Sequence, residues 1–272
     1  MPQQQIMFVV VDPNNEQHVA LERVALTAHL QEVKPFVRVF VAVDADAVDT
    51  RAHNTSLVRD QTWFDEKIHN VLDNAGVEHS VEVSWSSEWQ TSIMQSAKRA
   101  NADLIYLPVH ARVGNRRFFF TESKWELFKG AACPVVLIRP GAHAERKKVL
   151  AAVNFQAVRD VQIELNEKIL AAAHHFCKVY HAELHVVNGY MDSFSYPDRG
   201  RLAKETGVPT DRIHVDHGYT SEVVSNIAEK INADLVVMGT LGQNGMTKTR
   251  RGNTAERLIN ALDTDVMVIN HG

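Results

Sequence analysis

The chain has 272 residues, enough for one large domain or two of ordinary size. A hydrophobic content of 45% and a charged content of 23% are typical of a globular protein with a packed core. The formal net charge of −4 at pH 7 argues against nucleic acid as a partner bound through a basic face. Two cysteines, Cys133 and Cys177, do not indicate a disulfide framework and favour a reducing compartment.

The first residues, MPQQQIMFVVVDP, contain no basic leader and only a six-residue apolar run. A run of this length predicts a buried strand and not a signal peptide or a membrane span. We therefore expect a cytoplasmic protein without a membrane partner.

Short apolar runs alternate with amphipathic helical patterns along the whole chain. In the first half we expect strands over residues 6–11, 36–43, 81–83, 104–109 and 135–139, and helices over 16–30, 57–75, 93–100 and 121–129. Pro140, Gly141 and the charged run 145–148 are expected to form a linker. In the second half we expect strands over 149–153, 184–187, 213–215, 236–238 and 266–269, and helices over 165–180, 201–205, 223–231 and from residue 254. This alternation predicts an α/β fold with parallel sheets covered by helices on both faces.

The two halves repeat each other. NADLIYLPVHARVG from Asn101 aligns without gaps with NADLVVMGTLGQNG from Asn232, and VVVDPN at residue 9 corresponds to AAVNFQ at residue 151. A repeat of this length indicates a duplicated domain. We place the two domains at residues 1–143 and 144–272.

Near the C-terminus a strand ends in a loop with three glycines, Gly239, Gly242 and Gly252, in the spacing G-x2-G-x9-G. Asn253 and Glu256 then form a variant capping box for a following helix. Glycines let backbone amides approach a phosphate closely, and a helix start adds unpaired N–H groups and the positive end of its dipole. The alternative is a glycine-rich turn with a solvated basic rim.

Three cations, Lys248, Arg250 and Arg251, lie in the same loop and raise its positive potential. The spacing matches neither the dinucleotide fingerprint GxGxxG nor the Walker loop. It resembles the nucleotide-binding motif of the universal stress protein family. With the duplication, nearly the whole chain is similar to tandem members of that family, most of all to those of the E type, on the evidence of Val153-Asn154 and of GNTAE at 252–256.

The resemblance implies two tandem Rossmann-like domains of the adenine nucleotide alpha hydrolase-like fold, each a five-stranded parallel sheet with helices on both faces. It implies that the repeats pack as an internal pseudo-dimer, with a homodimer of chains left open. The implied ligand is ATP or a related adenine nucleotide, with a magnesium ion left open. The family's contacts, carried over to the second repeat, fall on Ala152, Asn154, Val186, Met238, Gly239, Gly242, Gly252, Asn253 and Thr254.

Several of these positions have a second interpretation or depart from the family pattern. Val186 and Met238, each taken alone, are better explained as core residues. Members that bind ATP usually have an aspartate after the first strand and a serine after the last glycine, where this chain has Asn154 and Asn253. The aspartate-to-asparagine exchange removes a charge that would help to hold a divalent metal.

The first repeat has lost the glycines. At the positions of Gly239, Gly242 and Gly252 it has Pro108, Ala111 and Thr121, and phenylalanines fill 118–120. A proline removes a backbone donor, and the larger side chains take up space that a triphosphate needs. We expect the first site to be degenerate.

The segment from Asn188 to Gly207 is too short for a full second helix, and whether it forms a pocket, an interface or a lid stays open. The histidines are interpreted as surface residues, and neither a metal cluster nor a catalytic motif is visible.

We expect a nucleotide-binding stress regulator that is not an enzyme, with slow ATP hydrolysis left open. The alternative is a nucleotide-independent interaction module for an unknown protein partner or a small apolar ligand.

Overall fold

The computed structural model describes residues 4–44, 61–109, 127–128, 130–241 and 254–271. Within these ranges the chain divides into two compact units, one of residues up to Val109 with Ala131–Pro140, and one of residues 127–128 and 130 with the chain from Gly141 onward. We call them unit 1 and unit 2. The predicted boundary between residues 143 and 144 stays a prediction.

Unit 1 contains five parallel strands in the order β3-β2-β1-β4-β5. They are β1 (Ile6–Val11), β2 (Phe36–Asp44), β3 (His79–Ser86), β4 (Leu104–Pro108) and β5 (Val135–Ile138). The first strand has the predicted bounds, and five of its six residues are buried, as expected for a central parallel strand covered on both faces.

The helices of unit 1 pack against this sheet and against each other. They are α1 (Val19–Leu30), α4 (Trp89–Arg99) and one helical stretch made of α2 (Gln61–Phe64), a π-helical turn (Asp65–His69) and α3 (Asn70–Asn74). Helix α1 packs on β1 and β4 and touches α3, while α4 packs on β2 and β3. The α3 stretch ends at Gly76, whose φ of 68° suits a residue without Cβ. The helix predicted over 121–129 lies mostly outside the described residues.

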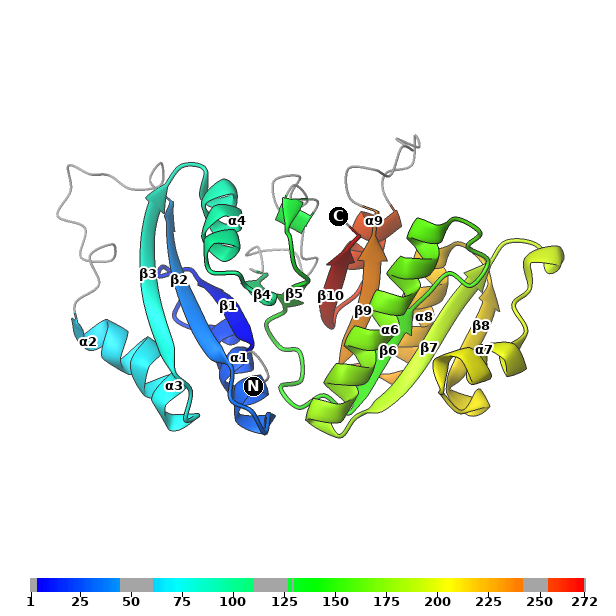
Figure 1. Cartoon of the computed structure of the whole chain (residues 1–272), viewed down its shortest axis with the longest axis horizontal. Helices are drawn as coiled ribbons and strands as arrows, with labels where there is room; N and C mark the ends of the chain where they lie inside the picture. Colours follow the sequence, from blue (N-terminus) through cyan, green and yellow to red (C-terminus); the bar gives the residue numbers. More distant parts are fainter. Residues whose placement is uncertain (1–3, 45–60, 110–126, 129, 242–253, 272) are drawn as a thin grey trace. The chain divides into compact units, whose positions relative to one another are not determined.

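Unit 2 repeats the arrangement, with the strand order β10-β9-β6-β7-β8. Its strands are β6 (Lys148–Ala152), β7 (Glu183–Tyr190), β8 (Ile213–His217), β9 (Leu235–Thr240) and β10 (Asp265–Asn270). Its helices are α6 (Asp160–Tyr180), α7 (Arg199–Thr206), α8 (Thr220–Ile231) and α9 (Thr254–Ala261). In Figure 1, α6 crosses the front of this sheet and α8 lies behind it, where α8 also contacts α9. The predicted α/β fold with helices on both faces of parallel sheets is confirmed.

The repeated sequence NADL has a structural explanation. Asn101 and Asn232 end helices α4 and α8 in the left-handed region, with φ of 50° and 52°, a conformation that asparagine tolerates better than most residues. Two residues later, Asp103 accepts a hydrogen bond from the backbone N–H of Ile6 at 2.7 Å. Asp234 does the same for Lys148 at 2.9 Å and also accepts from Lys147. In both units this carboxylate therefore aligns the start of the central strand with its neighbour.

The run predicted as a linker, 145–148, contains a fully buried charge, so that prediction is wrong for Arg146. The Arg146 Nη2 atom lies 3.1 Å from Asp265 Oδ2, and both side chains are completely buried. The guanidinium also lies 5.1 Å from the ring centroids of Phe176 and Tyr180, near the end of α6. The segment before β6 is thus fixed to the start of β10 and to the last turns of α6.

We expect the Asp265→Asn variant to lose about 3–5 kcal/mol of unfolding free energy, because it leaves the Arg146 charge buried without this carboxylate. Urea denaturation followed by circular dichroism measures the loss. The matched control is Glu205→Gln, which alters the exposed pair with Arg201 and should change the free energy by no more than about 0.5 kcal/mol. Equal, small losses in both variants would contradict a stabilising role for the buried pair.

Candidate functional site

Two of the predicted site residues, Ala152 and Asn154, lie at the carboxyl end of β6 and just after it. This strand is the centre of the unit 2 sheet, with β7 on one side and β9 on the other. The chain runs from β6 to β7 in one direction and later returns to β9 on the opposite side, so the strand order reverses between β6 and β9. In open parallel sheets, ligands bind outside the carboxyl ends of the strands at such a reversal. Ala152 and Gly239 lie on the two strands that flank it.

Asn154, the predicted nucleotide contact after β6, lies in a tightly bonded turn. Its Oδ1 accepts a hydrogen bond from the backbone N–H of Gln156 at 3.2 Å. Its own backbone is held by Asn166 of α6, which accepts from the Asn154 N–H at 3.0 Å and donates to the Asn154 carbonyl at 2.7 Å. Asn154 itself is exposed. While Oδ1 accepts within the turn, the Nδ2 group gives Asn154 a donor that it can offer to a ligand.

The first repeat closes the same turn with Asp12. The Asn14 backbone N–H donates to Asp12 Oδ1 at 2.9 Å, and the Asn15 side chain donates to Asp12 Oδ2 at 2.8 Å. The second repeat has Asn154 in place of this aspartate, which keeps the shape of the turn and removes its negative charge.

The other predicted contacts differ in how accessible they are. Ala152 is half-buried at the end of β6, and Thr254 is exposed at the start of α9. Val186 and Met238 are 0% and 4% exposed, as core residues are. The remaining three, Gly242, Gly252 and Asn253, lie outside the described residues.

Gly239 has a role in helix packing. A Cβ atom at this position would lie 2.6–2.7 Å from three carbon atoms of the Leu165 side chain. Leu165 belongs to α6 and is buried against the sheet. The glycine therefore lets α6 approach β9 closely, whatever else the motif does.

The place in unit 1 that corresponds to the predicted site of unit 2 has little free space. The hollow lined by residues that include Asp12, His18 and Pro108 has a volume of about 10 Å³, room for roughly one water molecule. The degenerate first site stays a prediction. Ala111, Thr121 and residues 118–120 lie outside the described residues.

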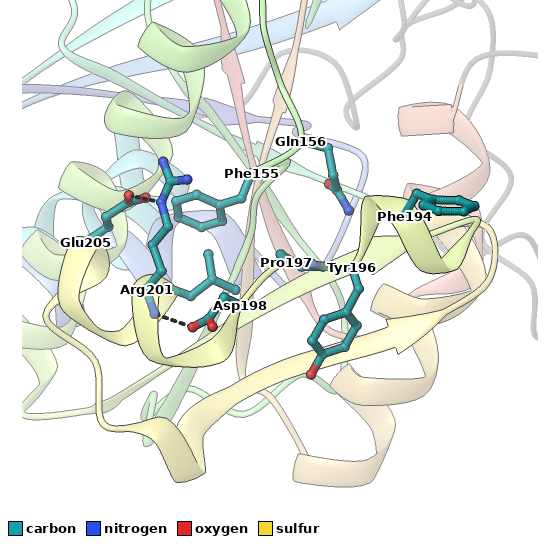
Figure 2. A pocket seen from close by; sticks show the side chains of 9 residues that line it. Phe155, Gln156, Phe194, Tyr196, Pro197, Asp198, Arg201 and Glu205 are labelled. Carbon is teal, nitrogen blue, oxygen red and sulfur yellow. Dashed lines mark hydrogen bonds and ion pairs between the residues drawn. The ribbon is translucent and has the colours of Figure 1, made fainter.

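The short segment after β7 forms the wall of a pocket, which answers one question that the sequence left open. The pocket has a volume of about 380 Å³ and adjoins the turn that follows β6. Figure 2 shows its lining, which consists of Phe155, Gln156, Phe194, Tyr196, Pro197, Asp198, Arg201, Leu202 and Glu205. Helix α7 carries the last three of these and runs from Arg199 to Thr206, longer than the predicted 201–205.

Polar and aromatic contacts hold the walls of this pocket in place. Asn188 of β7 accepts from the Phe155 N–H at 2.7 Å and donates to the Gln156 side chain at 3.0 Å. The Tyr196 ring packs edge-on against Tyr190, with centroids 5.2 Å apart. The asparagine and its partners are far apart in the sequence, so no local pattern predicts their contact.

The histidines are not all surface residues, and this prediction is wrong for His185. His185 on β7 is 8% exposed, and its ring stacks on His214 of β8 with Nδ1 3.1 Å from His214 Nε2. Burial and, to a smaller extent, the neighbouring His185 together lower the pKa of His214 to about 4. Burial also lowers the pKa of His185. Both rings are therefore neutral at pH 7.

The described residues offer little for metal or thiol chemistry. Within these ranges no three His, Cys, Asp or Glu side chains are grouped to hold a metal ion. Burial raises the pKa of the Cys133 and Cys177 thiols to about 12, so neither is a thiolate at neutral pH.

The fold and its glycine motif are those of a known family. The model of the universal stress protein family matches residues 5–139 and 196–270. The chain belongs to the universal stress protein family.

Two relatives match over almost the full length. The chain is 28% identical to universal stress protein E of Escherichia coli K12, over 99% of this chain and 95% of the relative. It is 25% identical to the universal stress protein E homolog of Haemophilus influenzae, over 97% of this chain and 96% of the relative. The predicted similarity to tandem members of the E type is confirmed.

Two solved structures share the fold. One is a protein of unknown function from Pseudomonas aeruginosa PAO1, with a TM-score of 0.81 and 21% identity over 98% of this chain and 92% of the other. The second is a universal stress protein from Archaeoglobus fulgidus, with a TM-score of 0.76 and 16% identity over 99% of this chain and 100% of the other. In the described part of our chain, every helix is too short or too polar for a bilayer crossing.

The Gly239→Ala variant tests whether packing explains this glycine. We expect a loss of about 1–3 kcal/mol in unfolding free energy, because the added methyl group overlaps Leu165. Leu165→Ala alone should cost about 2–5 kcal/mol through the cavity it leaves. In the double variant the methyl group has room, so the combined loss in urea denaturation should be smaller than the sum of the two. Simple additivity would show that Leu165 does not set the requirement for glycine.

The histidine pair predicts sensitivity to acid. The pKa of His214 is about 4 in the folded state and about 6.5 when unfolded, so the unfolded chain binds more protons between these values. Stability should be complete above pH 6.5 and fall as the pH drops towards 4. The His214→Gln variant should show a shallower decline between pH 6.5 and 4 in thermal denaturation. An unchanged pH profile would show that the pair does not contribute.

Proposed function

We propose that unit 2 binds an adenine nucleotide, ATP in the first instance, and that the protein regulates a stress response rather than catalysing a reaction. One observation carries this proposal. The loop with the G-x2-G-x9-G motif starts where β9 ends at Thr240 and stops where α9 begins at Thr254. It therefore connects the carboxyl end of a strand at the reversal of the sheet with the start of a helix, an arrangement that favours anions.

We expect different residues to contact different parts of the nucleotide. The turn at Ala152 and Asn154 meets the base or the ribose, with Asn154 as a hydrogen-bond donor. The backbone amides at Gly242, Gly252 and Asn253 meet the phosphates. The cations of the loop add attraction for a triphosphate, which high salt should weaken. With Asn154 in place of an aspartate, a magnesium ion would depend on the phosphates for its charged ligands.

Only one nucleotide should bind to each chain. Pro108 occupies the position of Gly239 in the first repeat, and the adjoining hollow holds about 10 Å³. The rival hypothesis is a nucleotide-independent interaction module. The lost first site and the exchange at Asn154 are the observations that favour it.

Calorimetric titration with ATP tests the proposal. We expect one site per chain, and we expect Gly242→Trp to abolish binding because the side chain takes the place of phosphate. Ala111→Trp is the matched control at the same position of the first repeat, and it should bind ATP as the unaltered protein does. Adenosine, which has no phosphate, should lose much less affinity than ATP in the Gly242→Trp variant.

Two results would contradict this function. Two equivalent sites would show that the first repeat is intact. No binding of ATP, ADP or AMP at millimolar concentration, with or without magnesium, would favour the interaction module.

A further inference from the structure

The pocket beside α7 has its own chemistry, distinct from that of the glycine motif. Its lining comes from the turn after β6, from the segment after β7 and from α7, and includes no residue of the motif. A ligand in this pocket therefore does not require a nucleotide at the motif.

Aromatic rings line the pocket and are only partly packed. In Figure 2, Phe155 and Phe194 lie on opposite sides of the group, with Pro197 between them. Phe194 is fully exposed, at 104% of its reference surface, and Tyr196 is 48% exposed. Burial of a phenylalanine side chain away from water is favourable, so a planar apolar ligand placed against it would gain that burial.

The charges of the pocket favour a cation. Its ionisable lining residues are two carboxylates, Asp198 and Glu205, and one guanidinium, Arg201. Arg201 Nε donates to Glu205 Oε1 at 2.6 Å, so these two charges compensate each other. Asp198 Oδ1 accepts from the backbone N–H of Arg201 at 2.7 Å, a contact that leaves the carboxylate charge in place. One negative charge is left in excess beside aromatic rings, which themselves attract cations.

The frame of the pocket is already assembled without a ligand. Gln156 is held by hydrogen bonds to Asn188 and Gly189, Asp198 caps α7, and Leu202 anchors that helix in the core. Little ordering is therefore left for a ligand to bring about, which lowers the cost of binding.

We propose that this pocket binds a small organic cation with a planar apolar ring. The ring lies against Phe155 and Phe194, and the positive group lies near Asp198. A molecule of the arylalkylamine class has both features and fits a volume of about 380 Å³.

The test is calorimetric titration of the nucleotide-free full chain with three probes that share one ring system. They are tryptamine, a cation; indole, which is neutral; and indole-3-propionate, an anion. We expect tryptamine to bind at least about tenfold more tightly than indole-3-propionate, because the anion meets the excess negative charge. An anion that binds as well as the cation, or no binding of tryptamine at millimolar concentration, would overturn the proposal. Competition between ATP and tryptamine would also overturn it as a separate site.

Variants separate the contributions of charge and ring. Asp198→Asn removes the charge and keeps the cap of α7, since asparagine caps helices as well as aspartate does. This variant should lower the affinity for tryptamine by about threefold to tenfold and leave the affinity for indole unchanged. Phe155→Leu should lower the affinity for all three probes. Glu229→Gln, an exposed glutamate on α8 outside the pocket, is the matched control and should change nothing.

The double variant Asp198→Asn with Glu205→Gln gives the sharpest outcome. It leaves Arg201 as the one charged residue of the lining, so the preference should reverse and indole-3-propionate should bind more tightly than tryptamine. Circular dichroism should show the same helix content as in the unaltered protein. A preserved preference for tryptamine in a folded double variant would show that the carboxylates do not select the ligand.

Discussion

The buried ion pair of Arg146 and Asp265 constrains unit 2 more than any local preference of its sequence. Two charges removed from water cost several kcal/mol each, and their attraction offsets this only while both are held in place. Arg146 precedes β6, Asp265 opens β10, and the rings beneath the guanidinium belong to the end of α6. With Asp234 bonded to the start of β6, the amino ends of three strands are fixed. The carboxyl ends carry the turn, the pocket and the motif loop.

The sequence was sufficient for what depends on local pattern. Apolar runs of three to eight residues between helical patterns specify parallel strands well, and the bounds 6–11 agree with the structure to the residue. The duplication followed from direct alignment. Arg146 was missed because a charged residue in a charged run reads as solvated, while its partner lies 119 residues away. The pairing of His185 with His214 depends on the register of β7 against β8, in which Val187 faces His214.

The candidate site likewise has a part that the sequence predicts and a part that it does not. That Asn154 follows a buried strand could be predicted from the apolar run before it, while its role as a ligand contact stays a prediction. The pocket could not be predicted, since Gln156 meets Asn188 only after β6 and β7 have paired. The family model likewise leaves residues 140–195 unmatched, and these include Asn154, Asn166 and Asn188. The two repeats keep the aspartate contact at the amino ends of their strands, made by Asp103 and Asp234, and differ at the carboxyl ends, where Pro108 replaces Gly239.

The close contact between Gly239 and Leu165 has a consequence for how such a motif changes over evolutionary time. A side chain at residue 239 requires the Leu165 side chain to move, so a lineage that stopped using its ligand would still be selected to keep this glycine. The first repeat, with Pro108 at the same position, shows that the restraint can be overcome. In unit 2 the first glycine of the motif is therefore evidence of helix packing as well as of a ligand.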